Sequence, residues 1–397
     1  MSDTKVKRNV KVEIIRLIAC MAVIWYHVRE LPWKSNGELS ETAVFFESLC
    51  TICVMTFFLI TGFFIYNKKG NIFSDWLSLI KKFLTQVFVP FLFVVIFTII
   101  FHDFLISKDT FIGCILKFSI VNIFTSLYDM LRYFTVIYLP GTAAHLWYVF
   151  SYAIIIIAYP ITRFVLTKLP KYVGYIILAI LTICMIVNDY YLFFGNPTYN
   201  LIFKIIHKPI YYSAWGHVLY NDILKKYVDC DGAQNCARIT RAYEPVIINI
   251  PMFVTAFVIY VITFIALFLT QVNYYLTLNG EYVYTSWLSL YSLVLTSAFV
   301  VMAYNINFEK FLNEKINNII YFISNRTLYI YLIHYLIITK LMSVGFQNIF
   351  TNNRPNIFYH LAYYVLYSLF IFIVTFATVL LIETIAKSIH KLLFHKC

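Results

Sequence analysis

The sequence predicts an all-α, polytopic membrane protein with about ten transmembrane helices and both termini in the cytoplasm. Of its 397 residues, 61% are hydrophobic and only 13% are charged, and the mean hydropathy is +0.77. A soluble domain has roughly 45–50% apolar and 25% charged residues. A chain this long and this apolar cannot bury its apolar surface in one aqueous core, so lipid has to solvate much of it.

Ten stretches are long and apolar enough to cross a bilayer as helices, for which roughly 20 mostly apolar residues are needed. The predicted spans are 12–31, 43–66, 82–101, 145–166, 173–194, 201–224, 246–270, 286–304, 319–342 and 357–386. No fixed-period repeat, low-complexity linker or appended soluble domain separates them. We therefore expect residues 1–397 to form a single transmembrane domain that retains its first span.

Two loops between the predicted spans are long. Residues 102–144 form an expected external loop, and within it the apolar segment 111–139 is interrupted by three charged residues. Because charges disfavour a spanning helix, we expect this segment to lie at the interface or to re-enter the membrane. Residues 225–245 form the only sizeable polar stretch and are expected to be a cytoplasmic loop.

The distribution of Lys and Arg sets the orientation. These residues gather in the segments that a cytoplasmic N-terminus places inside, whereas the expected external loop 271–285 has none. This asymmetry follows the positive-inside rule, and an even number of spans returns the C-terminus to the cytoplasm. A basic rim facing anionic lipid head groups accounts for the net charge of +12, so no nucleic-acid partner is needed. We expect a multi-pass protein of the bacterial plasma membrane.

The first predicted span carries Arg16 and His27, the two ionisable residues that are the strongest functional candidates. Ionisable groups within spans are costly, so each is a functional hypothesis by default. Arg16 and His27 are eleven residues apart, which at about 100° per residue places them within roughly 20° of one helix face. At 1.5 Å per residue they stand about 16 Å apart, with Arg16 nearer the cytoplasm. Glu30, three residues after His27, can reach the same face and hold the imidazole by a hydrogen bond.

This arrangement suits acyl transfer from an anionic carrier. The guanidinium of Arg16 can hold phosphate by paired hydrogen bonds. The imidazole of His27 can take a proton from an attacking hydroxyl, and the carboxylate of Glu30 can fix its tautomer. The alternative interpretation is that Arg16 extends to the cytoplasmic head groups and that His27 rests at the outer interface.

Other polar, aromatic or small residues are candidates to line the substrate path or to bind the cofactor. A histidine inside a span either serves a site or bridges helices through hydrogen bonds, and a glycine there favours close helix packing. A histidine and a tryptophan at the outer boundary also suit an ordinary aromatic belt. Basic residues at the inner side meet lipid head groups or a polyanionic cofactor. The substrate or pore candidates are Thr61, Gly62, Phe63, His145, Trp147 and His334, and the further cofactor candidates are Lys81, Lys82 and Arg163.

Several catalytic motifs are absent from the sequence. It has no P-loop, no Gly-x-Ser-x-Gly elbow, no His-Glu-x-x-His and no paired Cys-x-x-Cys set. These absences disfavour an ATP-driven pump, a serine lipase and a zinc protease, and no metal is predicted.

Five short motifs then occur in a fixed order along nearly the whole chain. They are Arg16 with His27, FFLITGF at 57–63, Lys81-Lys82 followed by Pro90, HLWYV at 145–149 and SNRTLYIYLIHY at 324–335. In this order the chain resembles acyltransferase family 3 of integral membrane acyltransferases, from about residue 9 to 385. Thr61 stands where that family usually has Ser, and Lys81-Lys82 stand where it usually has Arg.

The resemblance implies an acyl-coenzyme A donor, usually acetyl-coenzyme A, that approaches from the cytoplasm. It also implies an acceptor hydroxyl on a cell-envelope carbohydrate or lipid-linked sugar, and hence O-acetylation of polysaccharide. By this resemblance His27 is the catalytic residue, and Arg16 is a residue that either binds the cofactor or has a structural role. Glu30 as the orienting partner of His27 is our own inference.

Two other functions remain open. A transporter or flippase for a glycan or small polar solute uses intramembrane His and Arg equally well. A non-catalytic partner in an envelope assembly complex predicts that substitutions of Arg16 and His27 change only expression or association. The sequence leaves the acceptor, the acyl chain and the oligomeric state undetermined.

Overall fold

The structure is a computed structural model that describes most of the chain. The described residues are 9–28, 41–68, 70–100, 147–193, 201–225, 250–277, 289–308, 311–343 and 357–394. They form α-helices and two π-helices, and no β-strand occurs among them, which confirms the predicted all-α class. The segment 111–139, predicted to be interfacial or re-entrant, lies outside the described residues.

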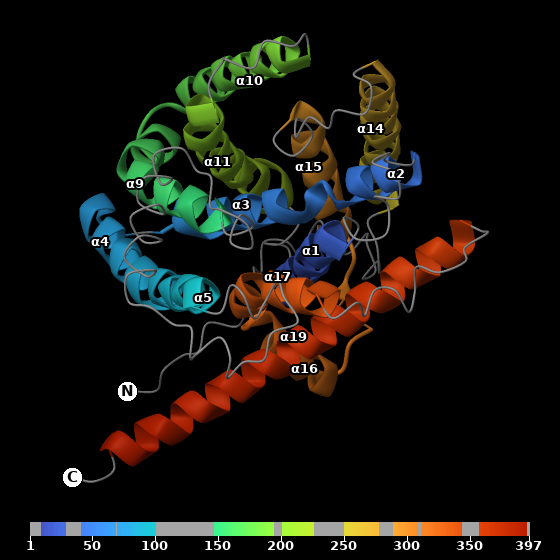
Figure 1. The fold of residues 1–397 in the computed structure, drawn as a ribbon. Helices are drawn as coiled ribbons and strands as arrows, with labels where there is room; N and C mark the ends of the chain where they lie inside the picture. Colours follow the sequence, from blue (N-terminus) through green and yellow to red (C-terminus); the bar gives the residue numbers. More distant parts are fainter. Residues whose placement is uncertain are drawn as a thin grey trace. The chain divides into compact units, whose positions relative to one another are not determined.

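Figure 1 shows the helices of the described chain. In the first half of the described chain they are α1 (Val10–Val28), α2 (Glu41–Cys50), α3 (Ile52–Ile65), α4 (Ile72–Phe83), η1 (Leu84–Phe88), α5 (Val89–Ile100), α9 (Trp147–Thr167) and α10 (Lys171–Phe193). In the second half they are α11 (Leu201–Val218), η3 (Leu219–Leu224), α14 (Ile250–Thr277), α15 (Leu290–Tyr304), α16 (Glu314–Ser324), α17 (Thr327–Ser343) and α19 (Ile357–Phe394).

Within the described residues, five helical stretches are long and apolar enough to cross a membrane. They are Glu47–Ile65, Ile72–Thr98, Trp147–Thr167, Ile250–Val272 and Val365–Ser388. Three shorter apolar stretches accompany them, Lys171–Val187, Leu290–Tyr304 and Thr327–Leu341. Each of these eight stretches overlaps a predicted span, but Ile72–Thr98 begins ten residues before the predicted start at 82. The number of ten spans and the cytoplasmic position of both termini stay predictions.

The predicted span 43–66 is interrupted at Thr51, between α2 and α3, and the predicted span 319–342 is divided by a turn. Residues 319–342 were expected to form a single helix, but α16 ends at Ser324 and α17 begins at Thr327. Helix α16 is amphipathic, and Ile319 and Phe322 are exposed on it. The turn between the helices carries Arg326, whose guanidinium forms a 2.8 Å ion pair with the carboxylate of Glu383 in α19.

The chain divides into two compact units. The first comprises Met1–Ala19, Thr51–Asp75 and Ile157–Asn325, and the second comprises Cys20–Cys50, Trp76–Ile156 and Arg326–Cys397. The boundaries fall inside α1, α4 and α9, so each of these helices contributes one part to each unit.

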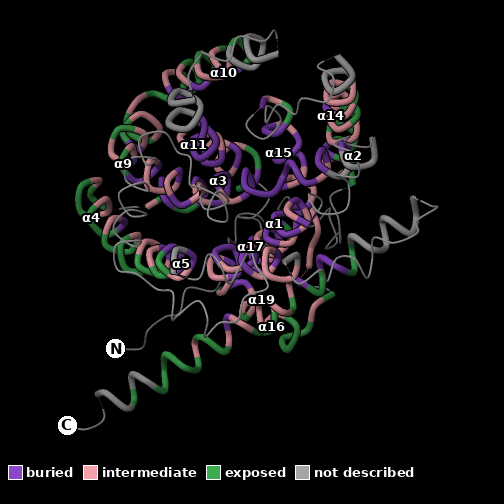
Figure 2. The backbone as a smooth tube through the Cα atoms, viewed as in Figure 1, coloured by how far each residue is buried: buried purple, intermediate pink, exposed green. Residues whose placement is uncertain are grey.

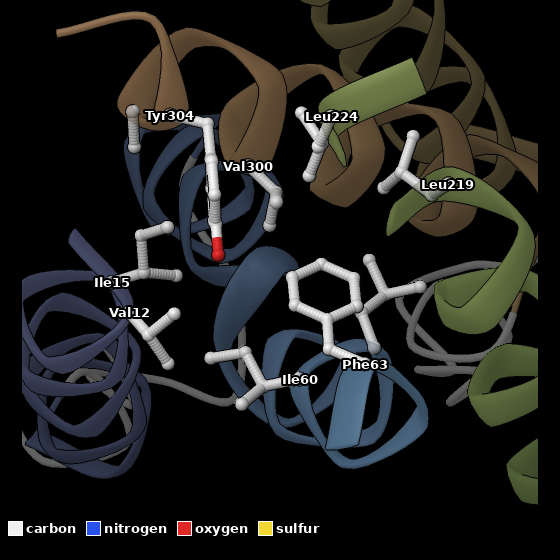
Figure 3. Close-up of a cluster of buried hydrophobic side chains, with 10 residues drawn as sticks. Val12, Ile15, Ile60, Phe63, Leu219, Leu224, Val300 and Tyr304 are labelled. Atoms are coloured by element: carbon white, nitrogen blue, oxygen red, sulfur yellow. The ribbon is translucent and has the colours of Figure 1, made fainter. Parts of the chain in front are cut away.

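Helix α3 forms the centre of the first unit. It packs against α11 and α15, and α15 also packs against α14. Nearly all of α3 is buried, whereas α14 keeps many partly or fully exposed residues (Figure 2). A cluster of apolar side chains from α1, α3, η3 and α15 fills the interior (Figure 3). Phe63 of α3 also stacks on Tyr220, with 5.3 Å between the ring centroids.

Two glycines let α3 and α11 approach each other closely. A Cβ atom on Gly62 would lie 1.8 Å from the carbonyl oxygen of Ser213, and one on Gly216 would lie 2.3 Å from the carbonyl oxygen of Leu59. Real Cβ atoms do not approach backbone this closely, so only glycine fits at either position. In lipid, helices associate through close packing rather than through hydrophobic burial, and small residues make that packing possible.

In the second unit, α17 packs against α5 and α19. Its residues Ile330, Leu332 and His334 are completely buried. The part of the SNRTLYIYLIHY motif from Arg326 onward thus belongs to the second unit, where His334 meets His27 in the second half of α1.

Candidate active site

His27 and His334 lie side by side in the second unit. Their ring centroids are 5.2 Å apart, although the two residues come from opposite ends of the sequence, on α1 and α17. Tyr335 stands edge-on to His27, with ring centroids 5.0 Å apart. His334 is fully buried and His27 is partly buried. The structure therefore joins two histidines that the sequence offered as separate candidates.

Aromatic side chains extend this histidine pair towards α9. The ring of Tyr331 lies 5.8 Å from that of His334, and the ring of Tyr148 lies 5.4 Å from that of Tyr331. Tyr148 belongs to the HLWYV motif at the start of α9. Three of the five sequence motifs thus contribute rings to one group within the second unit.

A backbone contact sets the tautomer of His334. Its Nδ1 lies 2.6 Å from the carbonyl oxygen of Tyr331. Because a carbonyl can only accept a hydrogen bond, Nδ1 donates and carries the proton. When the imidazole is neutral, its lone pair is then on Nε2, which is the arrangement that a proton acceptor needs.

Arg16 lies in the first unit, beside an acidic residue that the sequence analysis did not consider. Its Nη1 donates to Oε2 of Glu13 at 2.7 Å, and the two residues are one helical turn apart on α1. The same carboxylate oxygen accepts a hydrogen bond from the hydroxyl of Ser324, the last residue of α16. Helix α1 runs unbroken from Val10 to Val28, so Arg16 and His27 lie on one helix, as predicted.

Arg163, the other arginine predicted to bind the cofactor, is already saturated. Its Nη1 donates to the carboxylate of Asp75 at 2.7 Å and to the hydroxyl of Tyr159 at 2.6 Å. Its Nη2 donates to the carbonyl oxygens of Lys68 and of Gly70. The side chain is only 5% exposed, so Arg163 ties α9 to the loop before α4. By contrast, the side chain of Arg16 is 24% exposed.

The remaining candidates fall into three groups. Lys81 and Lys82 are exposed in the last turn of α4, and Trp147 is the first residue of α9. Thr61, Gly62 and Phe63 belong to the first unit, where the Thr61 hydroxyl donates to the carbonyl oxygen of Phe57 at 2.7 Å and the other two residues pack the helices. Glu30 and His145 lie outside the described residues. Among the described residues, no three His, Cys, Asp or Glu side chains gather as metal ligands.

The bonds of Arg163 give a first prediction. Removing the carboxylate in Asp75→Ala leaves a buried guanidinium without its counter-charge, which costs about 3–5 kcal/mol of stability. Asp75→Asn keeps an acceptor oxygen, so it is expected to lose less. The melting temperature of the purified protein in detergent measures both effects. An Asp75→Ala protein as stable as the wild type would show that this ion pair does not hold α9.

The fold and the site define a multi-pass membrane protein with a histidine pair among aromatic rings in one unit and a partly exposed arginine in the other. The family model described as an acyltransferase domain, that of acyltransferase family 3, matches residues 9–384, nearly the whole chain. The chain therefore belongs to acyltransferase family 3, and it is a membrane acyltransferase. No curated protein and no solved structure matches it.

Proposed function

We propose that this protein transfers an acyl group, in the first instance acetyl, from acyl-coenzyme A to a hydroxyl of a cell-envelope carbohydrate. The observation that carries the proposal is the contact of His27 with His334 and Tyr335 inside the second unit. An ionisable side chain in the interior of a membrane protein lowers stability, so its presence favours a functional role. Acyl transfer requires a base of this kind. Family membership supplies the reaction class.

In the proposed mechanism His27 acts as the general base. The imidazole takes the proton from the acceptor hydroxyl as the oxygen attacks the thioester carbonyl carbon. The tetrahedral intermediate then collapses, the carbon–sulfur bond breaks, and the imidazolium returns the proton to the leaving thiolate. The products are the acyl ester of the acceptor and free coenzyme A. Tyr335 and the buried His334 surround His27 and restrict the positions that its ring can take.

Arg16 is the proposed ligand for the anionic part of the donor. A guanidinium has five N–H donors, and within the described part of the chain Arg16 bonds only to Glu13. Partial exposure leaves its other donors for phosphate, which arginine binds through paired hydrogen bonds. Arg163 has no such capacity, because its two terminal nitrogens already serve four acceptors. Lys81 and Lys82 are exposed and stay candidates for the same anionic donor.

The test is an acyl-transfer assay in proteoliposomes with acetyl-coenzyme A labelled in the acetyl group. We expect the label to move to a carbohydrate acceptor and free coenzyme A to appear in proportion. The acceptor arms compare a soluble oligosaccharide with a lipid-linked one. Solute counterflow without any use of acetyl-coenzyme A would instead identify a transporter and end the proposal.

Arg16→Ala is expected to raise KM for acetyl-coenzyme A about tenfold to a hundredfold. The reason is that a hydrogen bond to a charged group contributes about 1.5–3 kcal/mol, and each 1.4 kcal/mol is about tenfold in affinity. Arg16→Lys keeps the charge but loses the paired geometry, so an intermediate KM is expected. Initial rates at varied acetyl-coenzyme A measure this effect, and an unchanged KM in both variants removes Arg16 from donor binding.

A further inference from the structure

Glu13 is a buried carboxylate on α1, with its side chain only 6% exposed. Taking a carboxylate out of water is unfavourable unless charge and hydrogen bonds compensate it. Two groups do so at the same oxygen, because Nη1 of Arg16 and the hydroxyl of Ser324 both donate to Oε2. The bonds connect Glu13 to a neighbour on its own helix and to a residue 311 positions away in the sequence.

The solvent exposure of Glu13, Ser324 and Arg16 indicates which of the three side chains is fixed in the interior. Ser324 is 1% exposed and Glu13 is 5% exposed as whole residues, whereas the side chain of Arg16 is 24% exposed. The hydroxyl and the carboxylate are thus fixed parts of the interior, and the guanidinium extends from them. An arginine side chain has several rotatable bonds and loses rotamer entropy when it is immobilised. A carboxylate that already fixes one nitrogen reduces what remains to be lost when an anion binds.

We infer that Glu13 is a positioning residue, which holds the guanidinium of Arg16 in the orientation that binds the anionic part of the donor. Ser324 in turn fixes the carboxylate of Glu13. This inference rests on the proposed function, because it assigns Glu13 a purpose in donor binding by Arg16. It also gives the first residue of the SNRTLYIYLIHY motif a role, since Ser324 acts at the donor-binding arginine while His334 of the same motif contacts His27.

A second ion pair in the same unit shows what a purely structural role looks like. The pair of Arg163 and Asp75 has the same 2.7 Å distance between nitrogen and oxygen. There the guanidinium is the buried partner and all its terminal nitrogens are bound, whereas in the Glu13 pair the carboxylate is the buried partner. The two pairs therefore make different predictions. Loss of the Asp75 carboxylate is expected to lower stability only. Loss of the Glu13 carboxylate is expected to weaken donor binding, whether or not it also lowers stability.

The experiment is a double-mutant cycle on KM for acetyl-coenzyme A in the full-length protein. Glu13→Ala is expected to raise KM about tenfold with kcat changed less than threefold, and Ser324→Ala is expected to raise it about threefold. Glu13→Gln keeps the shape and an acceptor oxygen for the guanidinium, so a KM within threefold of wild type is expected. Because Glu13 acts through Arg16, adding Glu13→Ala to Arg16→Ala is expected to raise KM no further.

The control is Asp75→Ala, which is expected to lower the melting temperature but to leave KM of the folded protein unchanged. If Glu13→Ala lowers the melting temperature as Asp75→Ala does and leaves KM unchanged, Glu13 is structural and the inference fails. If its effect adds to that of Arg16→Ala, the inference also fails, because Glu13 then acts elsewhere. If Arg16→Ala itself leaves KM unchanged, the role of Arg16 in the proposed function fails first, so the two failures are distinguishable.

Discussion

His27→Ala is expected to reduce acyl transfer by about 10²–10⁴-fold, the contribution that a positioned general base usually makes. The loss is expected in kcat, because the imidazole acts on the acceptor hydroxyl as the new bond forms, whereas binding of the donor depends on Arg16. The measurement is the rate of transfer from labelled acetyl-coenzyme A per folded protein, with folding checked by size-exclusion chromatography.

The control for His27 is His217, a buried histidine in another helix of the described chain. His217 lies on α11 in the first unit, where both ring nitrogens are within hydrogen-bonding distance of the side-chain nitrogen of Asn221. Because His217→Asn removes an imidazole away from the proposed reaction, the rate per folded protein is expected to stay near the wild-type value. Normal transfer by a folded His27→Ala protein removes the general-base mechanism.

Gly62→Ala is expected to prevent α3 and α11 from packing, and therefore to lower the stability of the folded protein strongly. The added Cβ atom would meet the carbonyl oxygen of Ser213 at 1.8 Å, and backbone cannot yield as a flexible side chain can. Overpacking a dense interior costs about 1–3 kcal/mol even where side chains can rearrange, so the cost here is expected to exceed that range. The measurements are the yield of monodisperse protein and its melting temperature in detergent.

Gly174→Ala on α10 is the matched control, because the same substitution there meets nothing closer than 3.9 Å. Alanine in a helix is favoured over glycine by about 0.8–1.0 kcal/mol, so this variant is expected to be as stable as the wild type or slightly more stable. Equal behaviour of the Gly62 and Gly174 variants would show that the close approach of α3 to α11 does not limit the fold.

The helical class could be read from hydropathy because the requirement for about 20 apolar residues is a property of the bilayer itself. The division of 319–342 was missed because apolar content alone does not separate a spanning helix from an amphipathic one. Capping chemistry was the available signal. The side chain of Asn313 accepts a hydrogen bond from the backbone N–H of Ile316, and Asn325 ends the helix.

The candidate site could be predicted only in part. Arg16, His27 and His334 stand out in the sequence because ionisable groups in spans are rare. Glu13 was within reach of the same reasoning, since residues three apart on a helix are neighbours. No local signal predicts that Ser324 contacts Glu13, that His334 contacts His27 or that Asp75 binds Arg163, because each pair is distant in sequence and is joined only by the tertiary fold.

The contact between Glu13 and Ser324 also has a consequence for how the chain is made. The ribosome completes α1 roughly three hundred residues before Ser324 exists, and contacts between such distant segments are late events in folding. During that interval the carboxylate of Glu13 lacks the hydrogen bond from Ser324, and a carboxylate that is buried without partners is costly. Arg16, one turn further along, compensates the charge as soon as the helix forms. The local pair thus gives the carboxylate of Glu13 a counter-charge before its distant hydrogen-bond donor has been synthesised.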